Sequence, residues 1–179
     1  MTKKVLILTG SPRKGGNSDT LSAEFMRGAK EAGHDVEMIR IADKNIQYCQ
    51  GCGACGHTGK CILKDDMSDI LDKMLAADVL VFATPVYFYS MSGQMKAMID
   101  RTVPKYTEIS NKEVYFIITA ADTDKAIMEK VIEALRGFTR DCLEGTEEKG
   151  IIYGLGVYEA GTVTSTSAMQ EAYEMGKRV

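Results

Sequence analysis

The sequence lacks several features that mark specialised classes of protein. No run of 18 apolar residues occurs, so no segment is long enough to cross a membrane as a helix. The charges nearly balance, with 22 Lys and Arg against 25 Asp and Glu, so the basic excess of a nucleic-acid binder is missing. Internal repeats, low-complexity tracts and domain linkers are also missing. We therefore expect a soluble globular protein without a membrane or nucleic-acid partner.

The N-terminal residues show no sign of a secretory leader. Residues 1–10 run directly into a strand-like segment, without the apolar region and cleavage site of a signal peptide. We therefore expect a cytoplasmic location, where cysteines stay reduced. With 179 residues and 45% hydrophobic residues, the chain has the size and composition of a single domain, with a cysteine-rich insert at about residues 42–64.

Apolar patterning predicts five strands that alternate with five helices. Short β-branched runs between turn residues are typical of strands buried on both faces of a parallel sheet. The strands are expected at residues 5–9, 34–41, 78–84, 112–120 and 150–157, and the helices at 17–32, 66–77, 91–102, 124–143 and 167–177. Asn17 or Ser18 is expected to cap the first helix. The alternation predicts an α/β fold with a doubly wound five-stranded parallel sheet, order 2-1-3-4-5, and helices on both faces.

A turn rich in glycine, residues 10–18, follows the first strand and opens the first helix. Its glycines let a ligand approach the backbone, and the helix N-terminus supplies free N–H groups and a positive dipole end. Ser11, Asn17 and Ser18 add polar side chains, and Arg13 can form charge-assisted bonds to a phosphate. The glycine spacing matches neither a dinucleotide-binding Rossmann loop nor a Walker A loop. The turn predicts a phosphate site, the alternative being a polar turn that only caps the helix.

An aromatic loop follows the third predicted strand and contains Pro85, Val86, Tyr87 and Phe88. In the order 2-1-3-4-5 the first and third strands are neighbours, so this loop and the phosphate loop face one crevice. Aromatic side chains and loop N–H groups suit a flat amphipathic ring such as that of a flavin. The alternative is that these aromatic residues belong to the core or to a subunit contact. Met91, Met95 and Met98 form a stripe that is either core or partly a dimer surface.

These segments together resemble a known family. The shared motifs are residues 10–18, the cysteines Cys49, Cys52, Cys55 and Cys61, the run 65–67, the loop 84–88, and Lys96, Ile99, Asp100 and Arg101. They resemble the NADPH-dependent FMN reductase family, and within it the iron–sulfur flavoprotein branch. The resemblance implies a flavodoxin-like fold and a homodimer or homotetramer with FMN near a subunit interface. It implies that the FMN phosphate is bound by Ser11, Arg13, Asn17 and Ser18, and the ring by Pro85, Val86, Tyr87 and Phe88.

Four of the five cysteines lie between Cys49 and Cys61. Three recur at every third residue and the fourth follows after five more, a spacing that lets four thiolates meet one 4Fe–4S cubane. Structural zinc sites usually use two separated cysteine pairs, so the spacing favours iron, although zinc and metal-free thiols stay open. His57 is either a substitute ligand or simply solvated. Cys142 is expected to be a small buried hydrophobic residue.

The expected function is an FMN-dependent oxidoreductase in which the flavin carries the chemistry and no side chain acts as acid or base. With a cluster, it would chiefly carry electrons between ferredoxin-like partners and an acceptor that the sequence does not identify; NAD(P)H is a possible electron donor, and the redox partner is a small molecule or a ferredoxin-like protein. Without one, it would be an NAD(P)H-dependent reductase of FMN, quinones, nitro or azo compounds. A rival of another class is a non-enzymatic module that binds zinc or senses redox state through thiols. Asp122 and Asp124 are expected to cap a helix or to contact the ribityl chain.

Overall fold

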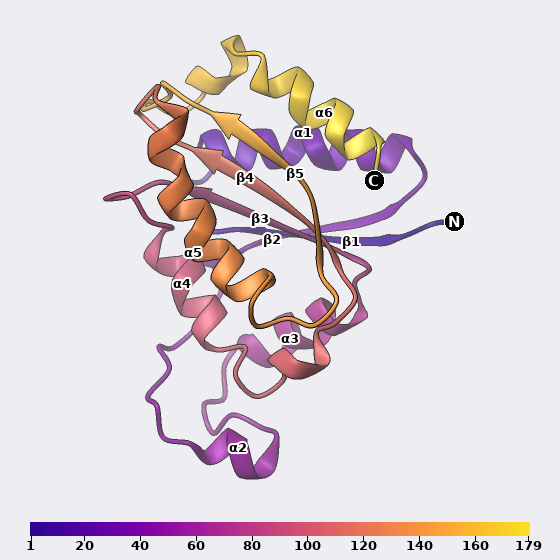
Figure 1. The fold of residues 1–179 in the computed structure, drawn as a ribbon, viewed down its shortest axis with the longest axis vertical. Helices are drawn as coiled ribbons and strands as arrows, with labels where there is room; N and C mark the ends of the chain where they lie inside the picture. Colours follow the sequence, from indigo (N-terminus) through magenta and orange to yellow (C-terminus); the bar gives the residue numbers. More distant parts are fainter.

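A computed structural model describes all residues 1–179 (Figure 1). Five parallel strands form one sheet in the order β2-β1-β3-β4-β5, as the sequence predicts. The strands are β1 Lys4–Thr9, β2 Asp35–Arg40, β3 Val79–Pro85, β4 Glu113–Thr119 and β5 Glu147–Gly154. The α-helices are α1 Asn17–Glu31, α2 Ala54–Thr58, α3 Met67–Ala76, α4 Gly93–Asp100, α5 Glu129–Thr139 and α6 Ala168–Lys177. Short 3-10 helices are η1 Ile41–Asp43, η2 Tyr106–Glu108, η3 Lys125–Met128 and η4 Thr162–Ser165.

Helices cover both faces of the sheet, α1 and α6 on one face and α3, α4 and α5 on the other (Figure 1). Each strand alternates its side chains between the two layers. Leu6 and Leu8 of β1 enter the core beneath α3, α4 and α5, whereas Val5 and Ile7 enter the core beneath α1 and α6. No helix has both the length and the apolar composition needed to cross a membrane.

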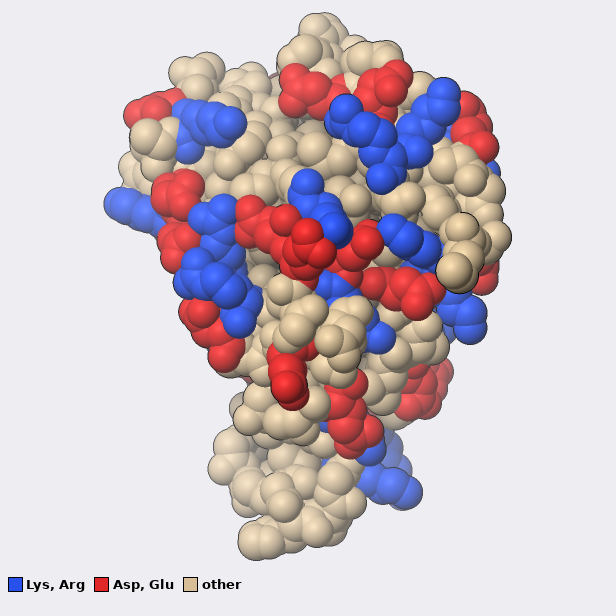
Figure 2. Space-filling view, turned by 45° about the vertical axis from the view of Figure 1, so that its right-hand side comes forward, with Lys and Arg blue, Asp and Glu red and all other residues tan.

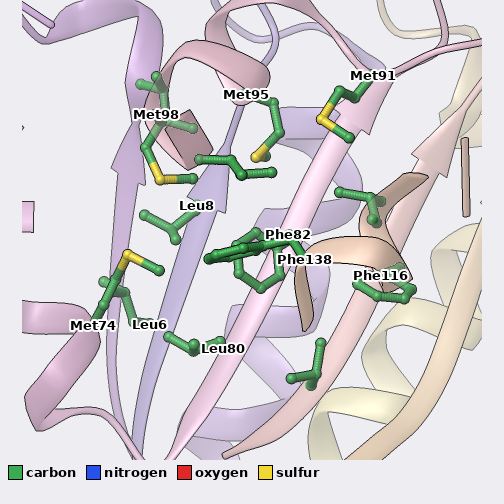
Figure 3. Packing of buried hydrophobic residues seen from close by; sticks show 14 of the residues in the cluster. Leu6, Leu8, Met74, Leu80, Phe82, Met91, Met95, Met98, Phe116 and Phe138 are labelled. Atoms are coloured by element: carbon green, nitrogen blue, oxygen red, sulfur yellow. The ribbon is translucent and has the colours of Figure 1, made fainter. Parts of the chain in front are cut away.

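The methionine stripe belongs to the core. Met91, Met95 and Met98 are 7%, 0% and 0% exposed and pack in one cluster with Phe82 (Figure 3). The prediction that part of this stripe forms a dimer surface is therefore wrong. Flexible thioether side chains fill the irregular space between α4 and the sheet.

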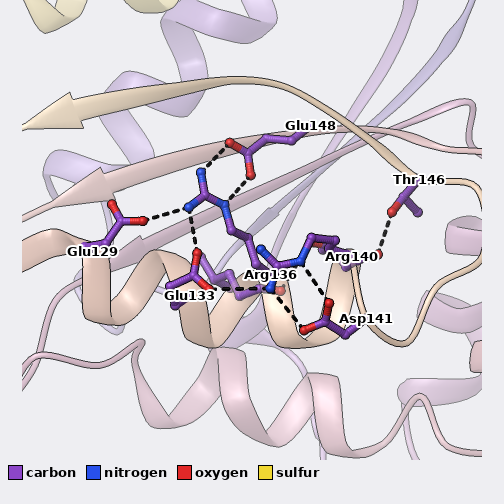
Figure 4. A network of polar contacts seen from close by, with 9 residues as sticks. Glu129, Glu133, Arg136, Arg140, Asp141, Thr146 and Glu148 are labelled. Carbon is purple, nitrogen blue, oxygen red and sulfur yellow. Dashed lines mark hydrogen bonds and ion pairs between the residues drawn. The ribbon is translucent and has the colours of Figure 1, made fainter.

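The edge strand β5 is held to α5 by a network of charged side chains. Arg136 of α5 makes a two-pronged contact with Glu148, from Nε to Oε2 at 2.7 Å and from Nη2 to Oε1 at 2.8 Å (Figure 4). It also pairs with Glu129 and Glu133 of its own helix. Charged residues on an edge strand discourage pairing with another chain. They also explain why β5 begins three residues before the predicted start, since Glu147 and Glu148 do not resemble a buried strand.

Several helix ends differ from the prediction. The N-cap of α1 is Gly16, and neither Asn17 nor Ser18 caps the helix. The predicted helix 124–143 is the 3-10 helix η3 followed by α5, with Asp124 accepting a bond from the N–H of Ala126. Cys142 lies beyond the end of α5 and is exposed, so the prediction of a buried cysteine is wrong. Its thiol donates instead to the carbonyl of Gly137.

Candidate functional site

Four loops meet at the edge of the sheet where the strands end. They follow β1, β3, β4 and β5, at residues 10–16, 86–92, 120–124 and 155–161. Hydrogen bonds join them. Ser92 Oγ donates to the carbonyl of Gly10, the N–H of Val86 donates to Thr119, and the N–H of Gly156 donates to Asp122. This edge is where open α/β sheets bind ligands.

The N-terminus of α1 opens onto this edge with unused backbone donors. The N–H groups of Asn17, Ser18 and Asp19 donate to no group of the chain, and Gly16 supplies no side-chain cap. Gly15 holds a φ of +66°, a conformation that favours glycine and turns the loop into the helix. Three free donors at the positive end of a helix dipole form a site for an anion such as a phosphate.

The buried carboxylate of Asp19 binds the backbone of the phosphate loop. Asp19 accepts bonds from Thr9 Oγ1 at 2.6 Å, from the N–H of Gly15 at 3.0 Å and from Arg40 Nε at 2.7 Å. Burial lowers the pKa of Arg40, but its bonds to Asp19 and Asp43 outweigh this effect and the pKa is raised. The guanidinium therefore stays charged and balances Asp19 next to the anion site.

The four predicted phosphate residues have different surroundings. Ser11 Oγ accepts a bond from the N–H of Arg13 at 3.2 Å, which shapes the turn. One guanidinium nitrogen of Arg13 donates to the carbonyl of Tyr158 at 2.7 Å, and the rest of this exposed side chain stays available. Ser18 Oγ lies 2.7 Å from Thr119 Oγ1 of β4.

Asn17 uses its whole side-chain amide to hold the loop after β5. Its Nδ2 donates to the carbonyl of Glu159 at 2.9 Å, and its Oδ1 accepts from the N–H of Gly161 at 3.0 Å. The groups that Asn17 and Ser18 leave free toward the crevice are therefore their backbone N–H groups.

The aromatic loop forms a tight turn with unusual backbone geometry. Tyr87 and Ser90 exchange two backbone hydrogen bonds, at 2.9 and 3.0 Å. The central residues, Phe88 and Tyr89, have φ values of +49° and +62°, as in a type I′ turn. Such turns favour Asn and Gly, and a bulky residue at positive φ costs roughly 1–3 kcal/mol. Backbone strain of this kind concentrates at functional sites.

An apolar groove of about 490 Å³ lies beneath this turn. It is lined by Val86, Phe88, Tyr89, Ala120, Ala121, Asp122, Ile127 and Met128. Phe88 is fully exposed at its rim and Tyr89 is half exposed. Its volume is within the usual range for a small-molecule site. Asp124 caps the 3-10 helix η3, as one of its two expected roles requires. Asp122 caps no helix, because its carboxylate accepts a bond from the N–H of Asp124, in the turn before η3.

The cysteine segment forms a separate lobe below the sheet. It leaves β2 at the edge that carries the crevice, extends past α4 and contains the short helix α2 (Figure 1). The face of this lobe that Figure 2 shows is mostly uncharged, with basic side chains at its right-hand edge. Cys49, Cys52, Cys55 and Cys61 all line one cavity of about 280 Å³. His57 is exposed and does not line that cavity.

The four cysteines line one cavity but do not converge on a point. No group of three or more His, Cys, Asp or Glu residues is arranged to hold a single metal ion. Zinc needs its sulfur ligands about 2.3 Å from one centre. A cubane has larger dimensions, because each thiolate binds a different iron. The donor set and the shared cavity therefore suit a cluster better than a mononuclear ion.

A buried ion pair forms the base of the lobe. Arg101, at the C-terminal end of α4, donates to Asp65 Oδ2 at 2.7 Å and Oδ1 at 3.0 Å, and to the carbonyl of Gln47 at 2.6 Å. The two charged side chains are 2% and 0% exposed. Burial raises the pKa of Asp65, but the bonds from Arg101 and from the N–H groups of Gln47 and Met67 outweigh this and the pKa is lowered.

The cysteine cavity and the crevice lie at opposite ends of α4. Ser92, before the first turn of α4, contacts the phosphate loop, whereas Arg101, after its last turn, lines the cysteine cavity. The eight residues of α4 rise by about 12 Å at 1.5 Å each. Sequence reasoning assigned no role to the ion pairs of Asp19 with Arg40 and of Asp65 with Arg101. The two residues of each pair are at least 21 positions apart in the sequence, so their contact is not visible before folding.

A family model decides what this arrangement is. The model of NADPH-dependent FMN reductases matches residues 3–138, well over half of the chain. The chain belongs to the NADPH-dependent FMN reductase family. It is thus a flavodoxin-like protein of a flavin-dependent oxidoreductase family, and the resemblance seen in its motifs is confirmed.

Curated relatives of this family member divide into two kinds. An iron–sulfur flavoprotein of Methanocaldococcus jannaschii is 42% identical over 101 residues, which cover 56% of this chain and 52% of that protein. The matched part is therefore about half the length of that relative. The protein YwqN of Bacillus subtilis, named as an NAD(P)H-dependent FMN-containing oxidoreductase, is 27% identical over 98% of this chain and 97% of its own.

Solved structures share the fold of this reductase-family chain. An FMN-dependent NADH-azoreductase of Bacillus anthracis, determined in complex with FMN, has a TM-score of 0.71 at 17% identity. The superposition covers 98% of each chain. The TM-score shows that the two chains share the flavodoxin-like architecture.

Proposed function

We propose that this protein is an electron-transferring oxidoreductase that binds FMN at the crevice and a 4Fe–4S cluster in the lobe. The observation that carries the proposal is the presence of two complementary sites in one chain of an FMN reductase family. One site offers free helix N–H groups beside an apolar groove, and the other offers four cysteines around one cavity.

The crevice fits FMN at both ends. The phosphate would accept bonds from the backbone of Asn17 and Ser18, from Ser11 and from the guanidinium of Arg13. The ring would lie against Pro85, Val86, Tyr87 and Phe88, where Phe88 offers a fully exposed aromatic face. Asn17 and Ser18 also hold the neighbouring loops through their side chains, which keeps the phosphate site in shape before FMN binds.

The lobe fits a cluster through Cys49, Cys52, Cys55 and Cys61. Four thiolates are the ligand set of a 4Fe–4S cluster, and they line one cavity without converging on a point. Several curated relatives carry the name iron–sulfur flavoprotein, which supports the same assignment. A cytoplasmic location would keep the four thiols reduced for cluster assembly.

When bound, FMN supplies the redox chemistry: it takes a hydride, with its two electrons, from NAD(P)H and releases those electrons as a pair or one at a time. The side chains of this protein would bind and orient the flavin, and the reaction would need none of them as a general acid or base. The electron acceptor would be a small molecule or a ferredoxin-like protein. Without a cluster, the same crevice would serve an NAD(P)H-dependent reductase of FMN, quinones, nitro or azo compounds.

We also propose a homodimer or homotetramer. Tyr48, Ile62, Phe88 and Val103 are large apolar side chains that are 79%, 56%, 100% and 49% exposed near the two sites. A second copy would cover such residues. Light scattering should give a multiple of the 19.6 kDa chain mass, and a monomer at micromolar concentration would contradict this proposal.

The flavin part of the proposal is tested by the colour and redox response of the protein. We expect a yellow to brown protein that releases FMN on denaturation and is bleached by NADPH or NADH without oxygen. A colourless protein that takes up no added FMN would contradict it and would favour a thiol or zinc module instead.

A further inference from the structure

Arg101 has a buried nitrogen whose N–H has no hydrogen-bond acceptor in the chain. Its two terminal nitrogens bind Asp65 and the carbonyl of Gln47, but its Nε–H has no partner although the residue is 2% exposed. A buried donor without an acceptor costs about 1–3 kcal/mol. Such a group points to an acceptor that binds there.

The surroundings of Arg101 indicate what that acceptor is. Arg101 and Cys61 line the cysteine cavity together, and both also line the adjoining groove of about 650 Å³. The only other charged residue that lines the cysteine cavity is Asp100, whose carboxylate pairs with Lys96 at 2.6 Å. Arg101 is thus the one cation that lines the cavity shared by the four cysteines.

The two charges of the ion pair differ in their access to the cysteine cavity. Asp65 lines the adjoining groove but not the cysteine cavity, whereas Arg101 lines both. Of the two charged groups, only that of Arg101 therefore lines the cavity of the four cysteines. The same guanidinium holds both ends of the cysteine segment, at Gln47 and at Asp65, which fixes its position relative to the thiols.

We infer that Arg101 is a positioning residue that sets the reduction potential of the cluster, by donating from Nε to the Cys61 sulfur or a cluster sulfide and by placing a positive charge beside it. A bond to sulfur and a nearby cation both stabilise the more negative, reduced cluster. This inference rests on the proposed cluster in the lobe. It assigns a role to a residue that touches no substrate.

The test compares potentials among variants of the holoprotein reconstituted without oxygen. The variant R101Q/D65N removes both charges of the buried pair, so it leaves no uncompensated ion. At a fixed solution potential, we expect the ratio of reduced to oxidised cluster to fall at least tenfold, which is 59 mV for a one-electron couple. Electron paramagnetic resonance during a redox titration measures this ratio. In K105Q, which removes an exposed cation of the adjoining groove, we expect less than a twofold change.

The conservative variant Arg101→Lys provides a second measurement. Lysine keeps the charge but has no Nε–H in a planar fork, so its potential should lie between those of the wild type and R101Q/D65N. If R101Q/D65N fails to hold iron, the inference is tested by Arg101→Lys alone. A reduction potential of this variant equal to that of the wild type would then overturn the inference.

The outcomes separate the inference from the proposal on which it rests. A wild-type protein that holds no iron after reconstitution overturns the cluster, and the role of Arg101 with it. Suppose instead that the wild-type protein holds a cluster and that the reduction potential of R101Q/D65N is no lower than that of K105Q. This result overturns the role of Arg101 but not the cluster. A lowered potential in R101Q/D65N and an intermediate one in Arg101→Lys support it.

Discussion

Two buried ion pairs between a carboxylate and an arginine support the two candidate sites of this protein. Asp19 with Arg40 supports the phosphate loop, and Asp65 with Arg101 supports the cysteine lobe. Breaking such a pair leaves an uncompensated buried charge, whereas an exposed pair contributes little to stability. The structure offers matched pairs of residues that separate these effects.

At the phosphate loop, Arg13→Ala should weaken FMN binding at least tenfold. The side chain is the charged donor of the loop, and a hydrogen bond to a charged group is worth about 1.5–3 kcal/mol. Fluorescence titration of the apoprotein with FMN measures the affinity. Lys14→Ala is the control, because Lys14 is an exposed neighbouring cation without a recorded partner, and its loss should change the affinity less than threefold. Equal effects of the two variants would contradict the assignment of Arg13.

Behind that loop, Asp19→Asn should lower the free energy of unfolding by about 3 kcal/mol, because it removes the buried carboxylate that balances Arg40 and leaves that guanidinium only the exposed Asp43. Urea unfolding measures the change. Asp43→Asn removes the other carboxylate that binds Arg40, but Asp43 is 56% exposed, so we expect less than about 1 kcal/mol. A larger loss from Asp43→Asn than from Asp19→Asn would refute this account of the loop.

At the scale of elements, the strained turn and the close helix contacts are the informative features. The turn carries two aromatic residues in a conformation that glycine and asparagine prefer. The helices α1 and α6 approach so closely that Gly28 and Gly176 contact backbone atoms across the interface. The strained turn suggests that function is maintained at the expense of stability. The contact between α1 and α6 reflects packing alone.

Replacing the turn by Phe88→Asn with Tyr89→Gly should raise the free energy of unfolding by roughly 1–3 kcal/mol, because both residues then tolerate positive φ. The same change should weaken FMN binding, since the exposed aromatic ring is lost. Tyr87→Asn alters a neighbouring exposed residue outside the two strained positions and should not stabilise the fold. Denaturation of the three proteins measures the free energy of unfolding, and titration with FMN measures the affinity. A turn variant no more stable than the wild type would contradict the strain at residues 88 and 89.

In the helix pair, Gly28→Ala should destabilise the protein by about 2–3 kcal/mol, because its Cβ would lie 2.1 Å from the carbonyl oxygen of Tyr173. Gly137→Ala in α5 is the matched control of opposite sign. No atom lies within 4 Å of the new Cβ there, so the better helix propensity of alanine should add about 0.5–1 kcal/mol. Thermal unfolding distinguishes the two, and a neutral Gly28→Ala would contradict the close packing.

Sequence patterns were sufficient for the elements with buried apolar faces. Strands β1, β3 and β4 are runs such as residues 5–9 that are buried on both faces, so local composition alone identifies them. The start of β5 was missed because its charged residues serve the edge and the ion pairs with α5. The end of α5 was placed too late because apolar residues such as Leu143 continue past Thr139, where the helix ends and the hydroxyl of Thr146 donates to the Thr139 carbonyl.

The candidate sites were predictable where the residues are neighbours in sequence. The glycine loop, the aromatic loop and the four cysteines each form one short segment, and the strand order brings the first two together. The Asp65 and Arg101 pair was not predictable, because residues 36 positions apart show their contact only after folding. For the same reason the sequence did not reveal that the cysteines lie at the far end of α4.

For the whole molecule, one helix separates two candidate redox sites. The crevice lies at the N-terminal end of α4 and the cysteine cavity lies beyond its C-terminal end, in a lobe that projects from the body (Figures 1 and 2). Such a lobe can meet a second subunit or a redox partner without disturbing the flavin crevice. The central claim is that one chain holds both groups.

The most direct test is the content of FMN, iron and acid-labile sulfide in the protein purified without oxygen. The account predicts about one FMN, about four iron and about four sulfide per chain, with the iron lost in a variant in which the four lobe cysteines are replaced by serine. That variant should keep its FMN, because its crevice is unchanged. Less than one iron per chain beside intact FMN would contradict the cluster, and the absence of FMN would contradict the account as a whole.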